Sequence, residues 1–96
     1  MLRHIVLVTF KPEASAEDRA ALRAAVEGFL ATVPEIRALR CGENVGRGPN
    51  HHDFAVVADF DDMAAFRRYI DSEAHKAYVA GPARAVARLA AIQHEF

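Results

Sequence analysis

The sequence predicts an α+β fold in which two helical segments cover one face of an antiparallel four-stranded sheet. Four stretches rich in β-branched and aromatic residues are separated by segments in which apolar residues recur at helical spacing. These stretches follow one another in the order βαββαβ. The chain of 96 residues is long enough for one domain, residues 1–96, and contains no internal repeat, linker or low-complexity segment.

The first half of the chain predicts a strand, a helix and a second strand. Residues 2–10 are rich in branched side chains and end before a Lys-Pro pair. Ser15 predicts the N-cap of a helix, and Pro34 ends that helix. Residues 36–44 predict a second, more polar strand. The helix carries one apolar stripe, which consists of Leu22, Val26, Phe29, Leu30 and Val33.

The second half predicts the remaining elements. Residues 46–50 predict a turn, and the apolar stretch 54–60 predicts a third strand. Ser72 predicts the N-cap of a helical segment that Gly81-Pro82 interrupts, and residues 90–96 alternate like a last strand. The segment before Ser72 is also helical, because apolar residues recur at Met63, Phe66 and Ile70. This order is the split βαβ arrangement called the ferredoxin-like fold.

Both faces of the predicted sheet are apolar, although the helical segments cover only one of them. We expect the uncovered face to carry the side chains of Val6, Val8, Phe54, Val56 and Phe60. Soluble monomers rarely expose an apolar patch of that extent. Two copies packed sheet against sheet would cover it, which predicts a homodimer in the form of a dimeric α+β barrel. The C-terminal tail or a different partner is the alternative cover.

Composition and charge exclude several classes of partner. The 12 basic and 13 acidic side chains nearly cancel, so we expect neither a nucleic acid nor a membrane as partner. No apolar stretch approaches the length of a membrane span, and the apolar N-terminal stretch is too short for a secretory signal. Cys41 is the single cysteine, so no internal disulfide forms. We therefore expect a cytoplasmic protein.

His75 is the strongest candidate for a functional residue. With Ser72 as N-cap, His75 takes the third helical position, where the positive end of the helix dipole favours a neutral imidazole. A neutral histidine accepts protons, and a nearby phenol such as that of Tyr69 polarises a carbonyl group. The commoner role of a histidine at a helix end is one structural hydrogen bond, and the spacing alone does not separate the two roles.

Other polar residues predict no metal or cofactor site. His51, His52 and Asp53 are types that bind metals, but adjacent strand residues point to opposite faces and do not share an ion. We expect a solvated loop end there. The three glycines at positions 42, 46 and 48 are not followed by a helix N-terminus, so they form no phosphate loop.

Two segments resemble the signatures of the stress-responsive A/B barrel family, the Dabb domain. Residues 3–11, RHIVLVTFK, resemble the opening of that domain. Residues 53–62, followed by Tyr69 and Ala74-His75, resemble its second signature. The resemblance covers nearly the whole chain and implies a dimeric α+β barrel. It also implies a cavity, either between the two sheets of the dimer or between sheet and helices within each protomer.

Most members of the Dabb family have no assigned activity. One branch, similar to plant polyketide cyclases, closes a linear polyketide by an aldol-type reaction without a metal or organic cofactor. The resemblance implies that the catalytic His and Tyr of that branch correspond to His75 and Tyr69, and that its first-strand His corresponds to His4. The branch carries a further pocket His at the position of Phe54.

Three functional hypotheses follow. The first is a homodimeric module without turnover, in which His4, Tyr69 and His75 form a buried hydrogen-bond network. The second is a cofactor-free enzyme acting on an apolar carbonyl compound: His75 abstracts an α-proton, Tyr69 hydrogen-bonds the enolate oxygen and His4 orients one of them. The third is a cofactor-free monooxygenase, which a relation to the antibiotic-biosynthesis monooxygenases, also dimeric α+β barrels, would imply. Those enzymes typically use an Asn and a Trp or a bound haem, and this chain contains no Trp. In the first two, a small apolar ligand would contact Val6, Leu30, Phe54, Phe66 and Tyr78.

Overall fold

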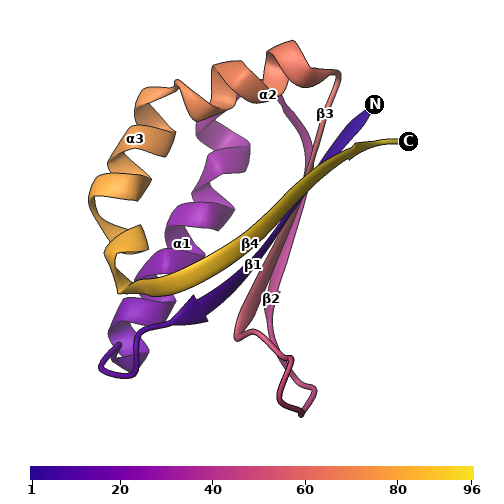
Figure 1. Cartoon of the computed structure of the whole chain (residues 1–96). Helices are drawn as coiled ribbons and strands as arrows, with labels where there is room; N and C mark the ends of the chain where they lie inside the picture. Colours follow the sequence, from indigo (N-terminus) through magenta and orange to yellow (C-terminus); the bar gives the residue numbers. More distant parts are fainter.

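The fold is a four-stranded antiparallel sheet with every helix on the same side of it (Figure 1). The computed structural model describes residues 1–96. Its elements are β1 (Leu2–Phe10), α1 (Ala16–Thr32), β2 (Ile36–Glu43), β3 (Phe54–Phe60), α2 (Met63–Ile70), α3 (Glu73–Ala80), the short 3-10 helix η1 (Pro82–Ala85) and β4 (Val86–Glu95). The strands lie in the order β2-β3-β1-β4. The predicted ferredoxin-like topology is therefore confirmed.

The helices begin where the sequence provides capping side chains. The Ser15 hydroxyl accepts a hydrogen bond from the Asp18 backbone N–H, and the Asp18 carboxylate accepts one from the Ser15 N–H. The Asp62 carboxylate caps α2 by accepting a hydrogen bond from the Ala65 N–H, and the Ser72 hydroxyl caps α3 by accepting one from the His75 N–H. Because each cap satisfies a backbone donor that the helix leaves unpaired, the start of each helix is fixed locally.

The last strand is longer than the sequence predicts. It begins at Val86 rather than at residue 90, and Val86 pairs with Phe10 at the end of β1. The stretch 86–89 follows a Pro-initiated turn and carries no alternating pattern of its own. Its strand conformation comes from pairing with β1, whose residues pair with β4 from Leu2 opposite Glu95 to Phe10 opposite Val86.

The expected assignment of the two sheet faces was wrong. Val8 and Phe60 are fully buried beneath the helices, and Phe54 and Val56 are buried with them. Val6 lies on the same face, half-buried. Strand alternation sorts side chains into two sets but does not say which set meets the helices. The face without helices instead carries Ile5, Leu7, Ala55, Val57, Ala90 and Ile92, which lie opposite one another in the strand register.

The core lies between this covered face and α1. Leu22, Val26 and Phe29 point from α1 toward the sheet and are buried. Phe29 also makes edge-on contacts with the rings of Tyr69 and Tyr78, whose centroids are each 5.4 Å from its own. None of the helices combines the length and the apolar character that a membrane span requires. The contacts with Phe29 pack Tyr69 of α2 and Tyr78 of α3 against α1, and the same residues line a cavity above the sheet.

Candidate functional site

A cavity of about 200 Å³ lies between the sheet and the helices. Four polar side chains reach it from three elements: His4 from β1, Tyr69 from α2, and His75 and Tyr78 from α3. No lining residue is charged at neutral pH in its ordinary state. The apolar part of the wall is formed by Val6, Val26, Phe29, Val56, Ile70, Leu89 and Ala91.

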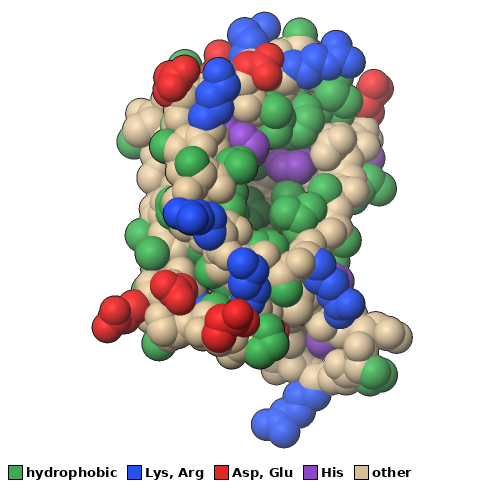
Figure 2. Space-filling model, turned by 60° about the vertical axis from the view of Figure 1, so that its left-hand side comes forward, with side chains coloured by type: hydrophobic (Ala, Val, Ile, Leu, Met, Phe, Trp, Pro, Cys, Tyr) green, Lys and Arg blue, Asp and Glu red, His purple; other side chains and the backbone are tan.

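The cavity opens at the edge of the sheet, between α3 and β4. Neither of these elements contains a buried residue, so they do not close against each other. On the molecular surface this opening is a hollow floored by hydrophobic side chains, with histidine side chains at its rim (Figure 2). A small molecule therefore has a direct route to the polar groups inside.

Tyr69 and His75 meet at the junction of α2 and α3. Tyr69 lies in the last turn of α2, and Ser72 starts α3 by accepting a hydrogen bond from the His75 N–H. This turn brings the two rings edge to face, with centroids 4.8 Å apart. The six-residue spacing in the sequence therefore becomes a direct contact because a helix boundary lies between the two residues.

The Tyr69 hydroxyl has no hydrogen-bond partner within the chain, although the residue is only 7% exposed. No side-chain nitrogen or oxygen that is sealed from the surface lacks a partner. The hydroxyl is therefore reachable, and the cavity that Tyr69 lines is the space that reaches it. An unpaired donor in an apolar cavity is available to bind a ligand oxygen.

Burial keeps these groups uncharged. It lowers the pKa of His75, an effect that the nearby Ile70 carbonyl partly offsets. Burial also raises the pKa of the Tyr69 and Tyr78 hydroxyls. At neutral pH the cavity therefore holds a neutral imidazole beside two protonated phenols. A proton acceptor beside a hydrogen-bond donor is the pair needed for proton transfer next to a carbonyl group.

His4 lies deeper, on the floor of the cavity. Its ring centroid is 4.7 Å from that of Phe66 and 6.4 Å from that of Tyr69. Burial, with a smaller contribution from His75, lowers the pKa of His4 to about 4. Its hydrogen bond joins Nδ1 to the side-chain nitrogen of Gln93, at 2.9 Å. His4, Tyr69 and His75 are thus brought together as packed rings, without hydrogen bonds among their side chains.

The residues expected to contact a ligand are only partly brought together. Val6 and Tyr78 line the cavity, whereas Phe66 lies against the His4 ring outside the lining set. Phe54 packs against Phe10, with ring centroids 6.4 Å apart. Leu30 is 54% exposed and borders a different hollow beside β2. Its place in the apolar stripe is misleading, because the buried side of α1 is narrower than the stripe.

Sequence reasoning missed Gln93 and the contribution of β4. Gln93 stands directly opposite His4 in the register of β1 and β4. Once βαββαβ topology is assumed, the last strand pairs with the first, so a polar residue facing His4 was the available signal. The position of Phe29 between Tyr69 and Tyr78 had no comparable signal, because a helix stripe does not show which side chain reaches a cavity.

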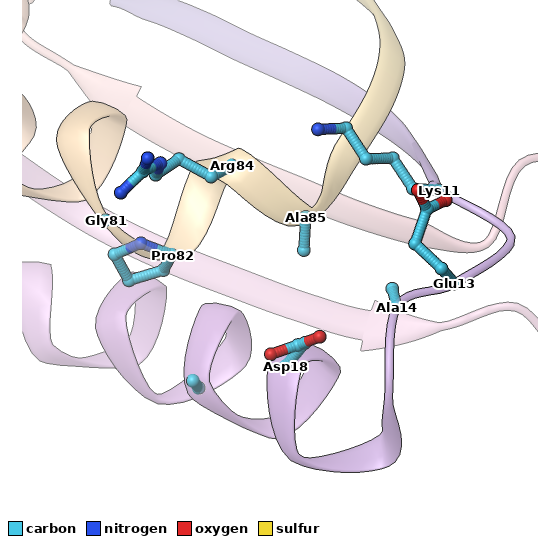
Figure 3. Close-up of a pocket in the computed structure, with 9 residues that line it drawn as sticks. Lys11, Glu13, Ala14, Asp18, Gly81, Pro82, Arg84 and Ala85 are labelled. Carbon is cyan, nitrogen blue, oxygen red and sulfur yellow. The ribbon is translucent and has the colours of Figure 1, made fainter.

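A second hollow, of about 290 Å³, lies between the start of α1 and η1 (Figure 3). Its charged lining residues are Lys11, Glu13, Asp18 and Arg84, and all four are exposed. Positive and negative charges are equal in number, and the Asp18 carboxylate is already engaged in the α1 cap. This hollow is therefore a weaker candidate for a ligand-binding site than the cavity that Tyr69 lines.

The histidine pair near β3 has a structural contact. The His52 Nδ1 atom lies 2.9 Å from the Thr9 hydroxyl, and the Asp53 carboxylate accepts a hydrogen bond from the Phe10 N–H. These bonds fasten the loop between β2 and β3 to the end of β1. His51 is exposed, so the segment is only in part the solvated loop end that the sequence predicts.

Comparison with known proteins places this geometry in a family. Residues 2–94 match the family described as the stress responsive A/B barrel domain, Dabb. The chain belongs to the Dabb family. An uncharacterized protein of Streptomyces coelicolor is 36% identical to this Dabb chain over 83 residues, which is 83% of this chain and 84% of that protein.

Solved structures show the same fold. A dimeric ferredoxin-like protein of unknown function from Thermobifida fusca is 30% identical, with a TM-score of 0.87 over 99% of this Dabb chain and 90% of that one. The hydroxynitrile lyase of Passiflora edulis is 18% identical, with a TM-score of 0.87 over 97% and 90% of the two chains. At that identity the lyase shares the fold of this Dabb protein, and its activity is a property of that protein.

Proposed function

We propose that this Dabb protein is a homodimer that binds a small, neutral, mainly apolar molecule carrying a carbonyl group. The observation that carries this proposal is the unpaired hydroxyl of the nearly buried Tyr69, which faces an apolar cavity beside the neutral His75. A carbonyl oxygen accepts the hydrogen bond that the hydroxyl has free. The lone cysteine leaves the fold independent of disulfides, and we extend the proposal to a cytoplasmic location.

The cavity selects for small and uncharged ligands. Its volume of about 200 Å³ is below the ~300–1,000 Å³ of sites for drug-sized molecules. A carboxylate or phosphate would lose its hydration there without meeting a cationic side chain, which is strongly unfavourable. A small aryl ketone such as acetophenone has the required shape and polarity, and it serves as the probe below.

A binding experiment tests this proposal through Tyr69. Acetophenone added to the protein is expected to shift the NMR signals of the residues lining the cavity. Tyr69→Phe removes one hydrogen bond to the ketone and keeps the ring, so its Kd is expected to rise by roughly tenfold, from about 1–1.5 kcal/mol of lost interaction. Thr32→Val, at an exposed position of α1 that does not line this cavity, is the matched control and is expected to bind like the wild type. Equal affinity of wild type and Tyr69→Phe would contradict the proposed role of the hydroxyl.

The homodimer is supported by the uncovered sheet face. Ile5 lies opposite Val57 on one neighbouring strand and opposite Ile92 on the other, and Ile92 is 56% exposed. Apolar side chains in the middle of an open sheet favour association with a second sheet. The Thermobifida fusca relative described above is a dimeric ferredoxin-like protein, which agrees with this arrangement.

Ile5→Glu tests the dimer. A buried carboxylate without a partner is strongly unfavourable in an apolar interface, so the variant is expected to be monomeric at micromolar concentration. Ile5 is partly exposed in the single chain and lies on the sheet face without helices, so the fold of the monomer is expected to persist. Light scattering after gel filtration measures the mass, and Glu17→Gln on α1 is the matched control. A dimeric Ile5→Glu variant, or a monomeric wild type, would contradict this part of the proposal.

Proton transfer is the second candidate function, and the contact between Tyr69 and His75 favours it. A ketone whose oxygen accepts a hydrogen bond from Tyr69 would lie within reach of the neutral imidazole of His75. The imidazole would then abstract a proton from the carbon next to the carbonyl, and the Tyr69 hydroxyl would stabilise the enolate oxygen. No step of this sequence needs a metal or organic cofactor.

A further inference from the structure

The hydrogen bond between Gln93 and His4 has a defined direction. The side-chain amide nitrogen of Gln93 lies 2.9 Å from Nδ1 of His4. An amide nitrogen carries two hydrogens and donates, so the Nδ1 atom accepts. In a neutral imidazole only one nitrogen carries a proton. The proton of His4 therefore lies on Nε2.

The Nε2 atom of His4 is left free by the rest of the chain. The residue is 7% exposed, and its one side-chain hydrogen bond uses Nδ1. Since no sealed side-chain nitrogen or oxygen lacks a partner, Nε2 is reachable. The His4 ring lines the cavity, so Nε2 is reached from the cavity. A nine-tenths buried N–H group without a partner thus borders the proposed ligand site.

We propose that Gln93 is a positioning residue that holds His4 with its proton on Nε2, so that His4 donates a hydrogen bond to the ligand oxygen in the cavity. The hydrogen bond from His4 to a ligand rests on the proposed function, because it needs a ligand in the cavity. It also gives the two histidines opposite roles. His4 is a donor, and His75 remains the proton acceptor.

The surroundings of His4 preserve this state over the physiological pH range. The titratable side chains that face it are Tyr69 from α2 and His75 and Tyr78 from α3. All are neutral at pH 7, and no carboxylate faces the ring to stabilise an imidazolium ion. Burial lowers the pKa of His4 to about 4. The imidazole therefore stays neutral, and Gln93 alone decides which nitrogen carries the proton.

Nitrogen-15 NMR of the histidine side chains tests the proton position directly. In the wild type the His4 spectrum is expected to show a protonated Nε2 and an unprotonated, hydrogen-bonded Nδ1. Gln93→Glu replaces the donor with a carboxylate that only accepts, while keeping the size of the side chain. The proton of His4 is therefore expected to move to Nδ1, and the pKa of His4 is expected to rise. Glu95→Gln, also on β4, is the control with an unchanged His4 spectrum.

Acetophenone binding tests the donated hydrogen bond. Gln93→Glu leaves an unprotonated Nε2 facing the ketone oxygen, so its Kd is expected to rise at least about tenfold relative to wild type. Gln93→Met removes the amide without adding charge, and a mixture of the two proton positions is expected. This second variant keeps the test decisive if the carboxylate prevents folding.

The outcomes separate the inference from the proposed function. A wild type with the His4 proton on Nδ1 overturns the positioning role of Gln93. A proton that moves in Gln93→Glu without any change in acetophenone affinity overturns the donor role of His4. A wild type with the proton on Nε2 that does not bind acetophenone overturns the proposed function, and the donor role with it, but leaves Gln93 in control of the proton.

Discussion

Replacing His75 with glutamine is expected to slow hydrogen–deuterium exchange at the methyl group of acetophenone by roughly 10²–10⁴-fold relative to the wild type. The centroid of the His75 imidazole lies 4.8 Å from that of the Tyr69 ring. The hydroxyl of Tyr69 is the group that would donate a hydrogen bond to the ketone oxygen. Burial lowers the pKa of His75, so its imidazole is unprotonated at neutral pH and ready to accept a proton. Glutamine keeps polarity and approximate size but has no basic nitrogen.

The exchange is measured by the loss of the methyl signal in D₂O with proton NMR. His94→Gln is the matched control, because His94 is exposed and lies on the strand register opposite Arg3, away from the cavity. It is expected to exchange the ketone at the wild-type rate. A His75→Gln variant that still binds the ketone and exchanges it as fast as the wild type would rule out His75 as the base.

Stability is expected to fall by about 3 kcal/mol as the pH drops from 6.5 to 4, because of His4 alone. Burial lowers the pKa of His4 in the folded protein to about 4 from the ordinary 6.5. Between these values the unfolded chain binds a proton at residue 4 that the folded chain does not. Proton binding therefore favours the unfolded state, and the stability contribution that is complete above pH 6.5 is lost as the pH falls. His75 adds to the loss in the same direction.

Urea unfolding at a series of pH values measures this effect. His4→Phe removes the titrating group and keeps a ring against Phe66, so its stability is expected to depend on pH much less than that of the wild type between pH 6.5 and 4. Thr32→Val, at an exposed position of α1, changes no titratable group and is expected to retain the wild-type slope. Parallel pH curves for wild type and His4→Phe would mean that His4 is not a neutral buried group.

Local features were predictable from the sequence wherever a side chain acts on its own backbone. Ser15 and Ser72 cap the helices that they precede, and the position of His75 in the first turn of α3 follows from Ser72. The pairing of Tyr69 with His75 also follows, because it depends on one helix boundary. These features need no knowledge of how distant segments pack.

Features that depend on packing between layers were not predictable. Val8 and Phe60 were assigned to the wrong sheet face, since alternation is symmetric between the two faces. Leu30 shares the helical stripe of α1 but lies at its exposed edge. The partner of His4 required the register between β1 and β4, which depends on sheet pairing across the whole chain.

Crystallography of the protein with bound acetophenone tests the central claim most directly, since it locates the ketone. The structure predicts the ketone in the cavity between sheet and helices, its oxygen within hydrogen-bonding distance of the Tyr69 hydroxyl and its methyl carbon toward the His75 ring. A ketone that binds with its oxygen turned away from Tyr69, or that binds only on the outer face of the sheet, would contradict it.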